Sequence, residues 1–196
     1  MKITLSINLG GYSFNIDDDA YEELKRYLKN LEFHFAGEES SQEILSDIET
    51  RMAELFRSKM TGYKQVITFQ DVRDVMSVMG SPEDIADDEG RSAKDKFSSP
   101  GYHRMYRDTD NRIIGGVCSG MAAYWGIDPI ILRVIFAALI FAGGLGLLIY
   151  LVLYIVLPEA KTTAQKIEMK GEPVNIHNIK ESVKKEFNNV RKNMKL

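Results

Sequence analysis

The side chains that most often carry out chemistry are few in this chain, and they are widely spaced. Cys118 is the only cysteine, and the three histidines are His34, His103 and His177. A cysteine nucleophile needs an activating group close to it, and a metal site needs several ligands together. Since no second cysteine and no histidine lies near Cys118 in the sequence, we expect it to be a small packed residue. We predict neither catalytic residues nor a metal site.

Two other patterns resemble binding sites for ions or phosphates. The acidic triplet Asp17–Asp19 lacks the spaced oxygen ligands and terminal Glu of a calcium loop, so we interpret it as the cap of a helix. The glycine pairs Gly115-Gly116 and Gly143-Gly144, the latter followed by Gly146, do not form a G-x-G-x-x-G between a strand and a helix, and no P-loop lysine follows. We therefore expect no cofactor and no enzymatic activity.

The glycines are better explained by close packing. Gly116 and Gly120 lie four residues apart, which places both on one face of a helix and lets another helix approach closely. Gly115, Gly143, Gly144 and Gly146 are further small residues beside the same apolar segment. We predict that all six glycines pack against another helix, either of this chain or of a partner.

The longest apolar run extends from Val134 to Leu157 without a charged residue. As one helix its roughly 24 residues would extend about 36 Å, enough to cross the ~30 Å hydrocarbon core of a bilayer. We expect one transmembrane helix. If Gly143–Gly146 breaks the helix, two pieces of about 18 Å would instead form a re-entrant hairpin with both ends on one side. Basic residues lie on both flanks, and a single span cannot satisfy the positive-inside rule at both of its ends.

Cationic and aromatic residues flank this run. We expect Arg107, Arg112, Trp125 and Arg133 to anchor the chain at the membrane interface, where amphipathic side chains are favoured. Arg133 is the charge nearest to the apolar run, so it should extend to the interface or pair with a carboxylate, with Asp128 the nearest candidate. Basic and aromatic residues together can also bind single-stranded nucleic acid, but beside an apolar run we predict no nucleic-acid binding.

The N-terminal part of the chain, to about residue 86, has the pattern of a small α+β domain. Period-two alternation around Gly10-Gly11 predicts a β-hairpin, and either a short strand or an extended entry to the next helix is expected at 65–68. Apolar residues at helical spacing predict three helices, which begin near Asp17, Ser41 and Thr68 and occupy about 17–31, 41–60 and 69–79. Pro82 fits the start of a further short helix, and the polar residues that follow indicate a linker.

The tail is predicted to be a basic amphipathic helix. Residues 161–196 carry nine basic and four acidic side chains, whereas residues 1–97 carry 12 basic and 20 acidic ones. Apolar residues recur at spacings of three and four from Ile176 to Met194. Such a helix could lie on an anionic membrane surface or form a short coiled coil with a partner, and the pattern does not separate these alternatives.

The predicted fold class is therefore α+β, with a small N-terminal β-hairpin plus helical domain, an interfacial helix, a transmembrane helix and a C-terminal amphipathic helix. The predicted domains are a head at 1–86, a linker at 87–103, a membrane domain at 104–158 and a basic amphipathic tail at 159–196.

The membrane domain resembles the PspC domain of the phage-shock protein C family. The residues that carry this resemblance are Arg107, Arg112, Gly115-Gly116-Val117-Cys118-Ser119-Gly120, Ala122, Tyr124, Gly126-Ile127-Asp128-Pro129, Arg133, Gly143–Gly146, Tyr150 and Leu157-Pro158. The head is similar to the HAAS domain through Tyr27-Leu28, Leu31, Glu43–Glu49 and the motif from Met79 to Ala86. The second resemblance implies an interaction domain without chemistry of its own.

The PspC resemblance implies a place in the bacterial cytoplasmic (inner) membrane, which we expect to leave the head in the cytosol. It also implies a non-enzymatic sensor or adaptor of envelope stress, working through protein partners in the membrane or cytosol and in contact with lipid. The alternative is a structural scaffold that forms homo-oligomers in the membrane without signalling.

Overall fold

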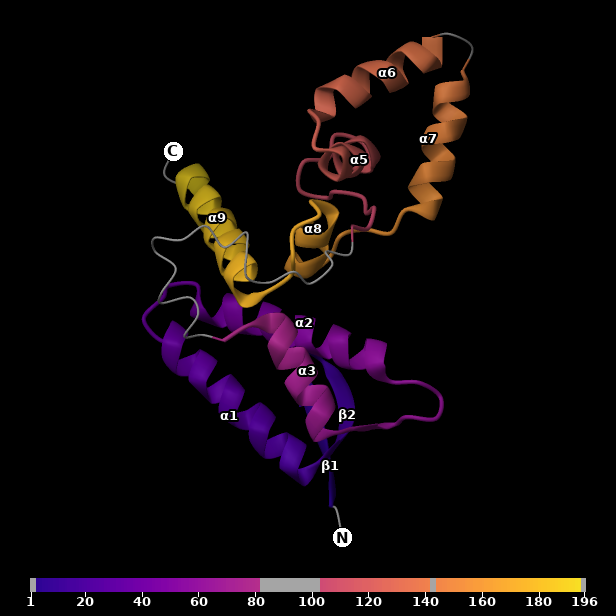
Figure 1. Cartoon of the computed structure of the whole chain (residues 1–196). Coiled ribbons are helices and arrows are strands. Elements are labelled where there is room, and N and C mark those ends of the chain that lie inside the picture. Colours follow the sequence, from indigo (N-terminus) through magenta and orange to yellow (C-terminus); the bar gives the residue numbers. More distant parts are fainter. Residues whose placement is uncertain (1–2, 82–102, 142–143, 195–196) are drawn as a thin grey trace. The chain divides into compact units, whose positions relative to one another are not determined.

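The computed structural model describes residues 3–81, 103–141 and 144–194, and the chain divides into two compact units (Figure 1). The head unit comprises residues 1–99 together with 174–196, and the central unit comprises residues 100–173. The short helix expected from Pro82 and nearly all of the linker lie outside the described residues. Gly143 also lies outside them.

The head unit contains a three-stranded sheet in the order β1-β2-β3. Strands β1 (Thr4–Leu9) and β2 (Tyr12–Asp17) pair antiparallel, with Leu9 opposite Tyr12. Gly10 and Gly11 form the connecting turn at φ values of 54° and 80°, which glycine adopts without steric cost. The two-residue strand β3 (Val66–Ile67) pairs parallel to β2.

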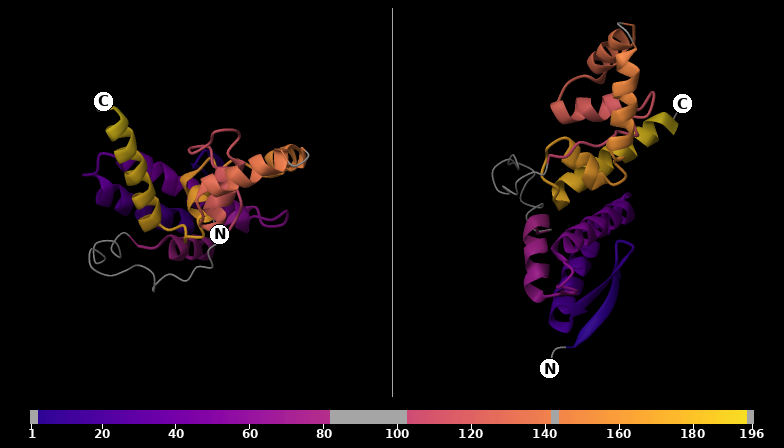
Figure 2. Two further views of the ribbon diagram at one scale, coloured as in Figure 1. Left: turned by 90° about the horizontal axis from the view of Figure 1, so that it is seen from above. Right: turned by 90° about the vertical axis from the view of Figure 1, so that its right-hand side faces the viewer.

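Three helices accompany this sheet, which forms a layer beside them in the right-hand view of Figure 2; the first two contact the sheet, and the third packs against those two helices. They are α1 (Asp18–Phe35), α2 (Ser41–Lys59) and α3 (Phe69–Met79), close to the predicted positions. Their apolar stripes form the core, which includes Leu24, Leu31, Phe35, Ile44, Ile48, Met52, Phe56, Val72 and Met79. Thr68 and Asp71 form a reciprocal capping box at the start of α3, as Thr68 predicted.

The basic tail helix α9 (Ile176–Met194) belongs to the head unit, where it packs against α2. Its buried apolar side chains are Ile176, Ile179 and Val183. The residues predicted as one tail are thus divided, because α8 (Thr163–Met169) belongs to the central unit. The helical period was predicted, but its apolar face meets a helix of the same chain.

The central unit also contains α5 (Val117–Trp125), α6 (Pro129–Phe141) and α7 (Leu145–Val156). The prediction of a transmembrane helix is wrong: over residues 3–81, 103–141 and 144–194, no helix has both the length and the apolar character needed to cross a membrane. The apolar run is divided between α6 and α7, whose lengths are only about 20 Å and 18 Å. Figure 1 shows the two helices diverging from their turn, with α5 between their other ends.

Gly144 explains the break. It lies at φ 77°, the left-handed region, and directly precedes α7. Its N–H donates to the carbonyl of Ile140 at 2.8 Å, which ends α6 with a bond to the last turn. A continuous helix would need this residue in the right-handed conformation.

Candidate functional site

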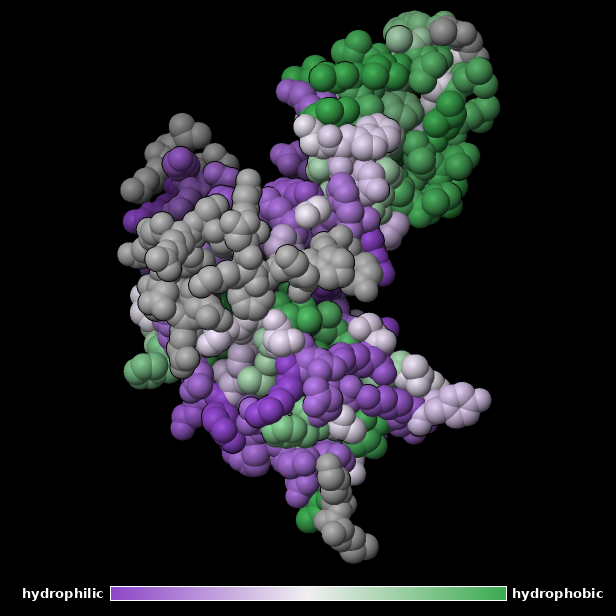
Figure 3. Space-filling model, in the orientation of Figure 1, coloured by the Kyte–Doolittle hydropathy of each residue, from purple (hydrophilic) through white to green (hydrophobic). Residues whose placement is uncertain are grey.

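The surface of α6 and α7 is the most unusual feature of the central unit, because it is apolar and open. Green, hydrophobic surface covers both helices in Figure 3. Only Leu132 and Phe136 of α6 and Gly146 of α7 are buried. The large apolar side chains left exposed are Ile130, Ile131, Val134, Ile135, Leu139, Ile140, Phe141, Leu145, Leu147, Leu148, Ile149, Leu151, Val152, Tyr154, Ile155 and Val156. A contiguous patch of this kind marks an interaction surface.

The sequence dictates this exposure. Apart from Arg133, no residue of α6 or α7 is charged, so neither helix has a polar face to turn towards water. Helices that are apolar all round are normally enclosed by protein or lipid. Here α5 and the opposite helix of the pair cover only one side of each.

The loop before α5 extends the same surface. Ile113 and Ile114 are 73% and 74% exposed, and Arg112 beside them is also exposed. Trp125, at the end of α5, is 52% exposed. Arg112 and Trp125 thus lie on the surface, with positions that suit interfacial anchors.

Arg107 occupies a different position from the one expected of an anchor. Its guanidinium is largely buried and donates hydrogen bonds to the carbonyls of Leu157 at 2.9 Å and Gly115 at 3.1 Å. It also pairs with Glu159 at 3.1 Å and lies 4.2 Å from the ring centroid of Tyr154. Arg107 therefore joins the loop before α5 to the end of α7.

The backbone reinforces this junction. The N–H of Arg107 donates to the carbonyl of Pro158 at 2.8 Å, and the N–H of Ala160 donates to the carbonyl of Arg107 at 3.0 Å. The segment that leads into α5 and the segment that leaves α7 are consequently bonded side by side. We call this the base of the hairpin, with the turn between α6 and α7 as its tip.

The predicted packing glycines make contacts inside the central unit. A Cβ added to Gly120 would collide with the carbonyl oxygen of Tyr106, and one added to Gly116 with that of Asp108. At Gly115 it would lie 2.7 Å from the ring of Tyr154, and at Gly146 2.8 Å from the carbonyl oxygen of Phe136. Gly144 has no such neighbour within 4 Å.

Arg133 and Asp128 are not brought together as a pair. Asp128 accepts the backbone N–H of Ile130 at 2.8 Å and so caps α6. Arg133 donates to the carbonyl of Asn111 at 2.9 Å and to the Ser119 hydroxyl at 3.3 Å. It extends back from α6 towards the loop before α5.

Two of the residues that could have suggested catalysis, His103 and Cys118, lie in the central unit. His103 stacks on Tyr124 with a centroid distance of 4.0 Å, and its Nε2 lies 3.1 Å from the carbonyl oxygen of Met169. Burial raises the pKa of the Cys118 thiol against the opposing charge of Arg133, which disfavours the nucleophilic thiolate at neutral pH.

Sequence reasoning missed the role of α8. The Tyr106 hydroxyl donates to Glu168 at 3.1 Å, and Tyr106 packs with Ala160 and Met169. Burial and the neighbouring Glu168 carboxylate raise the pKa of Tyr106. The capping box between Thr162 and Gln165 marks the start of α8 and was a readable signal.

Comparison with known families confirms the PspC resemblance: residues 103–160 match the family model of the PspC domain. The match covers most of the central unit and indicates a phage-shock-type envelope-stress family. Neither the curated proteins nor the solved structures gave a match. The HAAS-like character of the head stays a prediction.

Proposed function

We propose that the PspC domain of this chain anchors it to a membrane by a re-entrant helical hairpin, and that the anchored chain is a sensor or adaptor of envelope stress. The observation that carries the first part is the exposed apolar surface of α6 and α7. Lipid can cover such a surface on all sides at once, and the roughly 20 Å length of each helix suits partial penetration of a ~30 Å hydrocarbon core.

The base of the hairpin supports a topology in which the chain enters and leaves on one side. Arg107 and Pro158 flank the apolar segment and are hydrogen bonded to each other, so both ends of the hairpin lie together. At the tip, Gly144 donates to Ile140 and Leu147 donates to Gly144, which reduces the number of unpaired backbone groups in lipid.

This topology reconciles the basic residues on the two flanks with the positive-inside rule. Arg107 and Arg112 before the hairpin and Lys161, Lys166 and Lys170 after it would all lie on the side of the base. An excess of Lys and Arg favours the cytosolic side, so we place the base and the head at the cytosolic face of a bacterial inner membrane.

Flotation of the full chain with phospholipid vesicles tests the anchoring. Replacing Leu148, which is 63% exposed, with Asp should leave the fold intact but cost about 3 kcal/mol of insertion, because a carboxylate is unfavourable in hydrocarbon. Phe33→Asp is the matched control, since Phe33 is 87% exposed on α1 of the head. Equal flotation of the two variants would contradict the hairpin as anchor.

The sensor or adaptor role rests on the match to the PspC family model and on an exposed aromatic side chain of the head. Tyr63, in the loop between α2 and β3, is fully exposed and suits a contact with a protein partner. A photo-crosslinking residue at Tyr63 should capture a partner in intact cells whose amount changes when the envelope is stressed. Crosslinked adducts whose identity and amount do not change under stress would contradict the sensor or adaptor role.

A further inference from the structure

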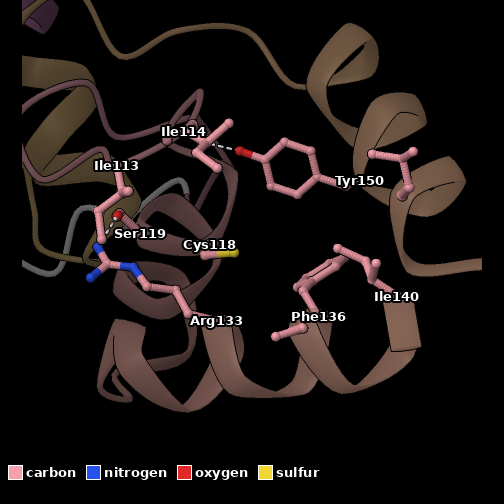
Figure 4. Close-up of a pocket in the computed structure, with 11 residues that line it drawn as sticks. Ile113, Ile114, Cys118, Ser119, Arg133, Phe136, Ile140 and Tyr150 are labelled. Atoms are coloured by element: carbon pink, nitrogen blue, oxygen red, sulfur yellow. Dashed lines mark hydrogen bonds between the residues drawn. The ribbon is translucent and has the colours of Figure 1, made fainter. Parts of the chain in front are cut away.

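A pocket of about 380 Å³ lies inside the central unit, between α5, α6, α7 and the loop before α5. Phe136, Ile140 and Leu147 form apolar walls, and Figure 4 shows the Cys118 sulfur directed into the space between Tyr150 and Phe136. The volume falls within the range of about 300–1,000 Å³ typical of small-molecule sites.

The polar wall of the pocket contains a cation with neutral partners. Arg133 donates through one terminal nitrogen to the Asn111 carbonyl and the Ser119 hydroxyl. No acidic side chain in the described part of the chain pairs with it, and Asp128 is used to cap α6. A guanidinium has five N–H donors in a planar fork that matches phosphate oxygens, so Arg133 retains donors for an anion.

The orientation of the pocket matches that of a lipid. Arg133 lies in the first half of α6, towards the base, whereas Ile140 lies about 10 Å further along the helix, towards the tip. The rim includes the exposed side chains of Ile114, Ile140 and Leu147, so the opening meets the apolar surface of the hairpin. A molecule in this pocket would have its anionic end near the base and its apolar end near the tip.

We propose that this pocket binds one acyl chain of an anionic phospholipid whose phosphate pairs with Arg133. The proposal rests on the insertion of the hairpin proposed above, because only then does the opening meet acyl chains. The net negative charge of the headgroup is complementary to Arg133, which pairs with no carboxylate among residues 3–81, 103–141 and 144–194. An acyl chain can also fill the apolar part of the pocket, where a water molecule would lack hydrogen-bond partners.

Native mass spectrometry tests the proposal with the full chain reconstituted in vesicles of phosphatidylglycerol and phosphatidylcholine and then released in mild detergent. We expect one retained phosphatidylglycerol per chain. Arg133→Gln should weaken this retention about tenfold, because a charge-assisted hydrogen bond is lost, whereas Arg26→Gln, on the exposed face of α1 in the head, should not. Ala137→Phe should fill the pocket and abolish retention, whereas Ala138→Phe, an exposed neighbour outside the lining, should leave it unchanged.

Cys118 provides a second measurement on the unmodified chain. As the only cysteine, it reports occupancy of the pocket through its rate of alkylation by N-ethylmaleimide at fixed pH. Phosphatidylglycerol added to the detergent-solubilised chain should slow this reaction, and equimolar phosphatidylcholine or inorganic phosphate should not. Equal rates under all three conditions would overturn the proposal.

Flotation of the same preparations separates the two hypotheses. If the unmodified chain does not float with vesicles, the membrane anchor fails and the lipid site fails with it. If the chain floats but retains no phosphatidylglycerol, or if Arg133→Gln and Ala137→Phe retain as much as their controls, the lipid site alone is overturned.

Discussion

Arg107 shows how one side chain can hold two distant segments in a fixed arrangement. It contacts Gly115, Leu157, Glu159 and Tyr154, of which only Gly115 is near in sequence. Its planar guanidinium satisfies two carbonyls, a carboxylate and an aromatic face together, which an ammonium group cannot do. At the scale of single residues, Arg107 fixes the base of the hairpin.

Arg107→Lys should therefore destabilise the central unit by about 2 to 3 kcal/mol, although the charge is kept, because two partly buried carbonyls lose their donors. Trp125 is the only tryptophan and lies in the central unit, so its fluorescence during thermal unfolding in detergent reports this change. The exposed Arg112 is the control, and Arg112→Lys should melt as the unmodified chain does. Equal melting of the two variants would contradict the role of Arg107.

The sequence indicated the importance of these residues but not their geometry. An arginine beside an apolar run has the same sequence pattern whether it lies among headgroups, as we predicted for Arg107, or bonds to a carbonyl 50 residues away. The close packing of Gly120 was suggested by its spacing from Gly116, but the partner, the backbone at Tyr106, follows only from the folded loop.

Among the secondary structure elements, α3 has a start that the sequence predicted well. Burial alone would raise the pKa of Asp71, but hydrogen bonds from Lys64 and Thr68 outweigh it and lower the pKa from 3.8 to about 2. A carboxylate whose pKa is lower in the folded state than in the unfolded state stabilises the fold at pH values above its unfolded pKa. This stabilisation is lost as the pH falls through the folded-state pKa. Asp71 should thus stabilise α3 above about pH 4 and progressively less towards pH 2.

Asp71→Ala should lower the free energy of opening of α3 by about 1 to 2 kcal/mol near pH 6, as expected for loss of a capping side chain. Amide hydrogen exchange over α3 measures this difference, which should shrink as the pH is lowered from 4 towards 2. Ser77→Ala, on an exposed position of the same helix, should have no effect at either pH. A difference that does not depend on pH would contradict the role of the Asp71 charge.

Helix α9 illustrates what periodicity cannot decide. Its apolar stripe and basic residues fit a membrane surface, a coiled coil or a groove on its own head equally well, since all three bury one face of an amphipathic helix. The structure pairs Lys180 and Lys184 with Glu38 at 3.2 Å and 3.1 Å, and Ile179 and Val183 are fully buried. Glu38 lies about 140 residues earlier in the chain, so the periodicity of α9 alone could not identify it as the partner.

Val183→Asp should detach α9 from α2, because it places an unpaired carboxylate among apolar side chains. Hydrogen exchange over α9 should then accelerate to the rate of an isolated helix. Val190→Asp is the control: Val190 lies on the same stripe but is 54% exposed, so exchange in the first half of α9 should not change. Protection of α9 that survives Val183→Asp would show that this packing does not hold the helix.

For the molecule as a whole, the apolar composition of the central segment was predicted, but its path was not. Length and hydropathy favoured one span, and the glycines at 143–146 left a break as the alternative. The outcome depends on the backbone conformation at Gly144 and on the bonding of Arg107 to Pro158, neither of which can be read from hydropathy. Together they turn an apolar run into a hairpin whose ends meet.

The central claim is that both ends of this hairpin lie on one side of the membrane. Positions 112 and 161 are both exposed, and each can carry a single cysteine in a chain that lacks Cys118. The two variants, Arg112→Cys and Lys161→Cys, each combined with Cys118→Ser, are expressed in cells. A membrane-impermeant maleimide should label the cysteines at 112 and 161 in the same preparation, either right-side-out vesicles or inverted ones. A cysteine at the tip, Phe141→Cys, should not be labelled in either preparation. Labelling of residues 112 and 161 from opposite sides would contradict the account.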